Sequence, residues 1–304
     1  MFKYHVLALL LGTILDFCFG RIYSIWNPFS TIKDWISYLD RALLGDEIIL
    51  LEPSKQRTLG GWLVFLTLLP VLILISFFTM LCYDIAPWVG VLFEAFASYL
   101  CLNGHYLFYG ARSVMTDYYG EGMSAMNYSA SVFMKQDVEE ETPEKTTEAV
   151  ITYLANEATD AVLSPLFVMF LFGPVGGFLY RTIDLIDGRI GHKNIRYEHF
   201  GYLAAKINSL VDYLPGRFNG ALTVFAARHT FGDFNGKNAK YIHLRDRNKA
   251  ISAYAGALEI SLKDGTIGDS DIIPEPKDIR RATNLLRNTF IIYQVFLLFL
   301  LVFF

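Results

Sequence analysis

Residues 161–180 read AVLSPLFVMFLFGPVGGFLY, an apolar stretch without a single charged residue. Acidic pairs flank it on both sides: Glu157 and Asp160 come before it, and Asp184 and Asp187 follow it. Carboxylates beside membrane-type sequence are costly to keep unless they face water, a cation or a ligand. This stretch therefore predicts an element embedded in the membrane with a chemical site next to it.

The composition of the whole chain agrees with a membrane protein. Apolar residues make up 53% of the 304 residues, which is more than a typical globular chain contains. The formal net charge of −4 argues against nucleic acid as the main partner. The three cysteines lie in apolar segments without a Cys-x-x-Cys spacing, so the sequence supports neither a disulfide framework nor a zinc site.

Long apolar runs predict an all-α, polytopic integral membrane protein that forms a single domain over residues 1–304. We expect four spanning helices and a cytoplasmic helical region over 181–283. The four spans are placed near 5–20, 61–82, 87–109 and 284–304.

The stretch 161–180 is predicted to enter the membrane and return on the same side, as a re-entrant helical hairpin. With this layout, 25 of the 26 Lys and Arg residues face one side, which the positive-inside tendency makes the cytoplasm. The central sequence FGPVGG over 172–177 also favours a turn, since proline cannot continue a helix and glycine allows a sharp reversal. The alternative is a single kinked helix that crosses the membrane.

The hairpin would bring both acidic pairs to the cytoplasmic surface. Glu157 and Asp160 are three residues apart, as are Asp184 and Asp187, so each pair shares a helix face. Converging carboxylates suit Mg²⁺, which prefers oxygen ligands and usually brings substrate phosphate with it. Nearby basic residues that could hold phosphate are Arg181, Arg189, Lys193 and Arg217. The alternative is that these acids and bases form structural salt bridges.

Several segments resemble the CobD/CbiB family, the membrane-bound adenosylcobinamide-phosphate synthases of cobalamin biosynthesis. The resemblance rests on ANEATDAVLSPLF, YRTIDLIDGRIGH and YLAAKINSLVDYLPGRF, which occur here in the family's order and spacing. Weaker matches are ILDFCFG at 14–20, RDR at 245–247 and DIRRATNLLR before the last helix. The resemblance covers nearly the whole chain, and its middle block is specific.

The resemblance implies an ATP- and Mg²⁺-dependent ligase that joins a corrinoid carboxylate to an aminopropanol-type amine, generally a phosphorylated one. It implies a bacterial or archaeal cell membrane with the active face in the cytoplasm, and it is compatible with an oligomer. The expected catalytic residues are Glu157, Asp160, Asp184 and Asp187, with Asp160 and Asp187 as metal ligands. The expected substrate-binding residues are Asp16, Arg189, Lys193, Tyr197, Asp212, Tyr213, Arg217, Arg245 and Asp246.

The chain also departs from the family pattern. A family Asp-Asp pair is Asn208-Ser209 here, asparagines are replaced by Asp184 and Asp212, and a Ser-Pro-Asn stretch after RDR is missing. Two hypotheses follow: a diverged but active ligase, or a non-catalytic relative with a regulatory or structural membrane role, by analogy with AmpE-like proteins.

Overall fold

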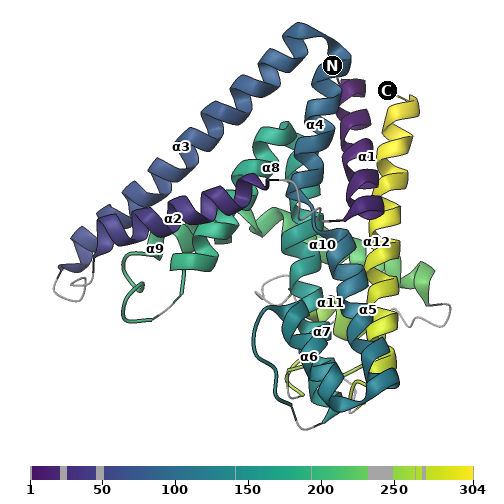
Figure 1. Cartoon of the computed structure of the whole chain (residues 1–304). Helices are drawn as coiled ribbons and strands as arrows, with labels where there is room; N and C mark the ends of the chain where they lie inside the picture. Colours follow the sequence, from purple (N-terminus) through teal and green to yellow (C-terminus); the bar gives the residue numbers. More distant parts are fainter. Residues whose placement is uncertain are drawn as a thin grey trace. The chain divides into compact units, whose positions relative to one another are not determined.

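The computed structural model describes residues 2–20, 26–45, 51–140, 142–192, 194–231, 249–263, 265–268 and 272–303. These residues are helical almost throughout and contain no strand, only an isolated bridge between Leu262 and Ile267 (Figure 1). The all-α prediction is therefore confirmed. The chain forms two compact units that alternate along the sequence: unit 1 comprises 1–15, 22–102 and 165–214, and unit 2 comprises 16–21, 103–164 and 215–304.

Most of unit 1 consists of helices α1 (Phe2–Phe19), α2 (Pro28–Leu44), α3 (Pro53–Ile85), α4 (Pro87–Cys101), α8 (Ser164–Ile190) and α9 (Tyr202–Val211). The helices of unit 2 are α5 (Gly104–Glu121), α6 (Met123–Met134), α7 (Pro143–Ala158), α10 (Tyr213–Thr230), α11 (Lys249–Leu258) and α12 (Pro276–Phe303), with a π-helical turn, η2 (Thr159–Leu163), after α7. The last turn of α1 also belongs to unit 2, and the first two residues of α10, Tyr213 and Leu214, belong to unit 1. Five helices begin with proline, which tolerates the first helical position because the N–H there has no partner within the helix.

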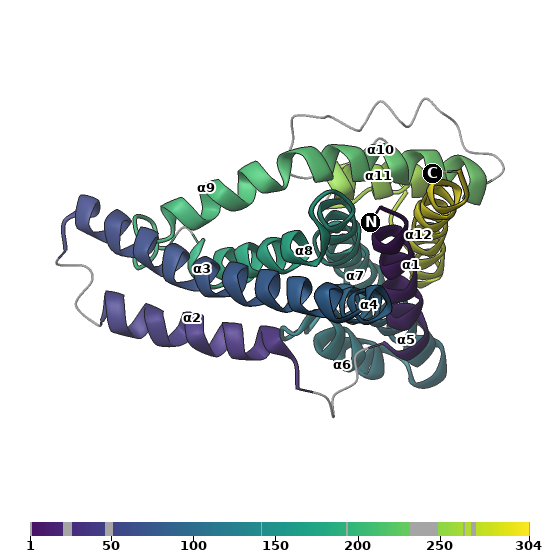
Figure 2. The ribbon, with the colours of Figure 1, turned by 90° about the horizontal axis from the view of Figure 1, so that it is seen from above.

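In unit 1, α3 is longer than the apolar core of a membrane is thick. Its 33 residues span about 50 Å at 1.5 Å per residue, whereas the bilayer core is about 30 Å thick. Its first half packs with α2, the end of α8 and α9 around a buried core that includes Ile36, Leu63, Ile186 and Phe200. Figure 2 shows these four helices running side by side. Gly60 permits this close packing, because a Cβ there would lie 1.9 Å from the Phe200 carbonyl oxygen.

The backbone of α8 is broken at Gly173, which has φ 66° and ψ −163°, a conformation open to glycine. Beyond the break the chain folds back: a Cβ at Gly177 would lie 2.4 Å from Met169 Cγ, and one at Gly176 would lie 3.2 Å from the Val168 carbonyl oxygen. In a straight helix, residues eight apart are separated by about 12 Å along the axis. The chain thus reverses within the FGPVGG sequence and its two arms touch, while the placement of this hairpin in the membrane stays a prediction.

Four helical segments in the described residues are long and apolar enough to cross a membrane: Phe2–Phe19, Pro53–Ile85, Pro143–Ile190 and Pro276–Phe303. The first, second and fourth of these segments overlap the predicted spans 5–20, 61–82 and 284–304. The remaining one, Pro143–Ile190, contains the folded-back segment. The segment 87–109, predicted as a span, is interrupted in the structure, because α4 ends at Cys101 and α5 begins at Gly104. Leu102 has an extended backbone, and the freed Gly104 N–H donates instead to the Asp16 carboxylate, at 2.8 Å.

Candidate active site

The two acidic pairs that flank the apolar stretch belong to different units. Asp184 and Asp187 lie on α8 in unit 1, whereas Glu157 on α7 and Asp160 in η2 lie in unit 2. Their convergence on one metal ion therefore stays a prediction. Unit 1 also contains the predicted residues Arg189, Tyr197, Asp212 and Tyr213, while unit 2 contains Asp16 and Arg217. Lys193, Arg245 and Asp246 lie outside the described residues.

The carboxylate of Asp187 is the centre of a polar cluster in unit 1. Its Oδ2 accepts a hydrogen bond from the Asn208 amide of α9, at 2.9 Å. Asp187 Oδ1 and Asn208 Oδ1 are both buried and have no hydrogen-bond partner among the described residues. Buried oxygens without a donor are costly, and a cation is one group that would satisfy them.

Gly191, which follows α8 directly, makes room for this carboxylate. A Cβ on residue 191 would lie 1.9 Å from Asp187 Oδ1 and 2.6 Å from the Asp187 carbonyl oxygen. Any side chain at this position would displace the Asp187 carboxylate or the end of the helix. The GRIGH sequence therefore has a steric reason for its second glycine.

Asp212, in the turn between α9 and α10, adds another acid to the cluster. Its Oδ1 accepts a hydrogen bond from the Tyr180 hydroxyl, at 2.6 Å. The pKa of Asp212 is raised to about 6, chiefly by burial and also by the charges of Asp184 and Asp187, while the hydrogen bond from Tyr180 acts in the opposite direction. A carboxyl group with a raised pKa beside other acids marks a region of excess negative charge, which favours a bound cation.

Asp184 is partly neutralised by the protein itself. Its Oδ2 lies 3.0 Å from Arg181 Nη1, one turn earlier on α8, and the charge of Lys33 on α2 also acts on it. The salt-bridge interpretation thus applies to Asp184. It does not apply to Asp187, for which the described residues provide no ion pair.

The cluster does not form a complete metal site. Among the described residues, no three His, Cys, Asp or Glu side chains are placed to hold one metal ion together. Mg²⁺ commonly binds through one or two carboxylates, water and substrate phosphates, so the unsatisfied oxygens of Asp187 and Asn208 fit a partial Mg²⁺ site of this kind.

A second polar group in unit 1 surrounds Asp40 of α2, which the sequence reasoning missed. Its buried carboxylate accepts a hydrogen bond from the Tyr197 hydroxyl at 2.8 Å, and Arg189 Nε and Arg196 Nη2 lie 3.8 and 4.0 Å from it. Burial raises the pKa of Tyr197, and so does its hydrogen bond to Asp40. Two residues expected to bind substrate, Arg189 and Tyr197, are therefore engaged with a structural acid.

Among the predicted residues of unit 2, Asp16 is buried, whereas Glu157, Asp160 and Arg217 are half-buried. Asp16 is buried and its carboxylate caps the N-terminus of α5 through the N–H groups of Gly104 and His105. Asp160 lies in the π-helical turn, a local geometry that is often found at functional sites. Just after this turn, the Ser164 hydroxyl accepts a hydrogen bond from the Asn219 amide at 3.0 Å, which ties η2 to α10.

Comparison with known proteins points to one family. A family model described as CobD/Cbib protein matches residues 9–286. The similar proteins include the cobalamin biosynthesis protein CobD of Listeria monocytogenes serotype 4b, 28% identical over 260 residues that cover 82% of this chain and 80% of that protein. They also include the probable cobalamin biosynthesis protein CobD of Methanocaldococcus jannaschii, 25% identical over 303 residues that cover 96% of each chain. No solved structure matches the chain.

Proposed function

Because the chain belongs to the CobD/Cbib protein family, we propose that it is a membrane-bound ligase of cobalamin biosynthesis. The reaction would be that of an adenosylcobinamide-phosphate synthase, in which a corrinoid side-chain carboxylate is joined to an aminopropanol-type amine at the expense of ATP. The names of the relatives support the pathway. The amide-forming chemistry is the inference that has to be tested.

The observation that carries the proposal is the pair of unsatisfied oxygens, Asp187 Oδ1 and Asn208 Oδ1, among the acids of unit 1. Amide formation with ATP requires a protein that holds Mg²⁺ and phosphate beside the carboxylate to be activated. Asp187 and Asn208 would hold the metal ion from the protein side. Bound Mg²⁺ would neutralise phosphate charge and polarise the phosphoryl group.

Other residues of the cluster would position Asp187 and Asn208 and determine the charge around them. Tyr180 fixes Asp212 through its hydroxyl, and the pKa of about 6 leaves Asp212 mostly ionised at neutral pH. Arg181 holds Asp184 at 3.0 Å, so that its carboxylate has a defined position on α8. Gly191 keeps the space in which the Asp187 carboxylate turns toward Asn208.

The test is turnover by purified protein in lipid nanodiscs supplied with adenosylcobyric acid, aminopropanol phosphate, ATP and Mg²⁺. We expect mass spectrometry to detect the amide product, and we expect Asp187→Asn to abolish it without lowering the melting temperature. Asp84→Asn, a charge-matched change at an exposed acid near the end of α3, should retain activity. Failure of the wild-type protein to bind adenosylcobyric acid in a direct titration would exclude the ligase. Binding without product would favour the non-catalytic, AmpE-like role.

A further inference from the structure

Three arginines meet on one side of unit 2, where α5 packs against α12. Arg112 of α5 donates from Nε to Thr283 Oγ1 at 3.1 Å and from Nη2 to Asn284 Oδ1 at 2.7 Å. Thr283 and Asn284 lie three or four residues from both Arg280 and Arg287 on α12, so these side chains share the helix face that Arg112 touches. The guanidinium of Arg112 thus binds the stretch of α12 between Arg280 and Arg287, and the charges of both arginines act on it.

No acidic side chain of the described residues is paired with this cluster. Within the part of the chain that the structure describes, none of the three arginines forms an ion pair, whereas their neighbour Arg281 is paired with Asp278 at 2.8 Å. Burial lowers the pKa of Arg112, and the charges of Arg287 and Arg280 lower it further. Three like charges held together by helix packing are unfavourable on their own and become favourable when an anion binds between them.

We propose that Arg112, Arg280 and Arg287 form a binding site for the phosphate group of a small ligand. The planar guanidinium group presents paired N–H donors that match two phosphate oxygens, which makes arginine the usual residue for this task. Arg280 is exposed and Arg287 is half-buried, so an anion can reach the cluster from solvent.

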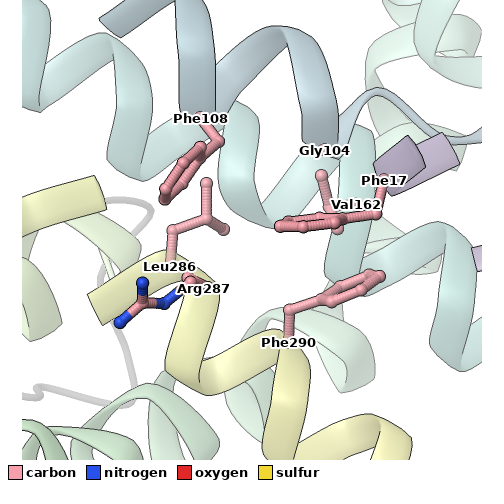
Figure 3. A pocket seen from close by; sticks show the side chains of 7 residues that line it. All are labelled: Phe17, Gly104, Phe108, Val162, Leu286, Arg287 and Phe290. Carbon is pink, nitrogen blue, oxygen red and sulfur yellow. The ribbon is translucent and has the colours of Figure 1, made fainter. Parts of the chain in front are cut away.

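A small apolar pocket adjoins the cluster and restricts the ligand. Arg287 lines it together with three phenylalanines and three small or aliphatic residues: Phe17, Phe108, Phe290, Gly104, Val162 and Leu286 (Figure 3). The Phe17 and Phe290 rings stack at a centroid distance of 6.3 Å, which closes one side of the pocket. The space accommodates about one water molecule or one methyl group.

The arginine cluster and the adjoining apolar pocket together fit a small phosphomonoester with one short apolar branch. This identification rests on the proposed function, in which the amine substrate is an aminopropanol phosphate with a single methyl branch. The phosphate would bind the three arginines and the methyl group would enter the pocket. A methyl group that is fully removed from water contributes about fourfold in affinity.

Binding is measured without turnover, by calorimetric titration of 1-aminopropan-2-ol phosphate into the full-length protein in phosphatidylcholine nanodiscs. Arg280→Gln and Arg287→Gln are each expected to weaken binding about tenfold or more, since each removes a charge-assisted contact. Lys277→Gln removes the same charge from an exposed position on α12 and should leave the affinity unchanged. Ethanolamine phosphate, which lacks the methyl branch, should bind about fourfold more weakly than 1-aminopropan-2-ol phosphate.

Equal affinities of wild type and both arginine variants would overturn the proposal. It would also be overturned if the arginine variants changed only the retention of phosphatidylglycerol in mixed nanodiscs, because the phosphate would then be that of a lipid. The result of this binding experiment can be distinguished from the result of the ligase assay. Loss of phosphate binding in the variants upholds the site even when the wild-type protein forms no amide.

Discussion

At the scale of single residues, the carboxylate of Asp187 occupies space that any side chain at position 191 would fill. We therefore predict that Gly191→Ala weakens divalent-cation binding about tenfold, because a Cβ would lie 1.9 Å from Asp187 Oδ1 and displace this ligand. Binding is measured by titration with Mn²⁺, which takes similar oxygen ligands and is visible by electron paramagnetic resonance.

The matched control is Gly188→Ala, three residues earlier in the same sequence. A Cβ at Gly188 meets no atom within 4 Å, so this variant should bind Mn²⁺ like the wild type. It should also gain up to about 1 kcal/mol of stability, because alanine favours the helix more than glycine does. Equal Mn²⁺ affinities of the two variants would show that Asp187 is not a ligand.

The raised pKa of Asp212 predicts how cation binding depends on pH. Its pKa of about 6 lies above the ordinary value, so a cation that binds beside it must displace a proton at lower pH. We predict that Mn²⁺ affinity falls between pH 7 and pH 5, by up to about tenfold per pH unit below pH 6. Asp212→Asn should remove this step, whereas Asp84→Asn should retain it. A pH profile that Asp212→Asn leaves unchanged would contradict the assignment.

In the absence of a cation, the raised pKa of Asp212 makes the folded protein more stable at low pH than at neutral pH. The folded protein binds the Asp212 proton more tightly than the unfolded chain, so the contribution of Asp212 is fully present below pH 4. This contribution is lost as the pH rises through about 6. Bound cation would reverse the loss, because it favours the ionised carboxylate. The cluster is thus less stable in its empty, ionised form than either with a proton or with a metal ion.

The sequence alone identified the acids on α8 as candidate site residues, but it did not identify the residues that contact them or the Asp40 cluster. Asp184 and Asp187 stand out because charge beside an apolar run is conspicuous. Asn208 was counted as a lost acid, although its amide hydrogen-bonds Asp187 and its position four residues before Asp212 places both on one face. Asp40 escaped notice because its partners Arg189, Arg196 and Tyr197 are about 150 residues away in the sequence, and only the packing of α2 on α8 joins them.

At the scale of helices, local signals account for most boundaries and tertiary contacts for the rest. Prolines start five helices, and the FGPVGG sequence reverses the chain, both for reasons that lie within a few residues. The break between α4 and α5 could not be inferred in this way, because Leu102 continues the apolar pattern. It is stabilised by Asp16, whose carboxylate receives the Gly104 N–H from 88 residues away.

One buried polar cluster joins three apolar helices of unit 1 to the hairpin. Glu94 of α4 is hydrogen-bonded to His5 of α1 and accepts a hydrogen bond from the Tyr83 hydroxyl of α3 at 2.6 Å. His5 Nε2 in turn donates to the Phe170 carbonyl at 3.1 Å, just before the break at Gly173. The cluster therefore fixes the tip of the hairpin against α1, α3 and α4.

We predict that Glu94→Ala destabilises the protein by about 2–3 kcal/mol, because it leaves His5 and Tyr83 without their acceptor in an apolar environment. Tyr83→Phe removes one donor and leaves the Glu94–His5 contact intact, so it should cost about 1 kcal/mol. Melting temperatures in detergent measure both effects. If Glu94→Ala melted at the wild-type temperature, the cluster would not hold these helices together.

At the scale of the whole molecule, charge and hydropathy separate into different regions of the chain. Lys and Arg residues are absent from the turn at 83–86, whereas the region 181–287 is rich in them. Single-sequence reasoning captured this distribution and the polytopic helical fold, because both follow from the cost of placing charge or backbone in lipid. The single domain over 1–304 stays a prediction, and the described chain divides into two compact units whose segments alternate in sequence. Such an arrangement depends on contacts between distant segments that no local pattern encodes.

The charge distribution also predicts on which side of the membrane each loop lies. If 161–180 enters and returns, a cysteine at Val175 reacts with a membrane-impermeant maleimide from neither side or only from the cytoplasm. In the same layout, Asp84→Cys reacts only from outside and Tyr119→Cys only from inside, so they calibrate the two faces. The assay needs a background without Cys18, Cys82 and Cys101, since Cys18 is exposed. Labelling of Val175→Cys from outside would mean that the segment crosses the membrane. The acids on α8 would then lie on the opposite side from Glu157 and Asp160, and the two pairs could not serve one metal ion.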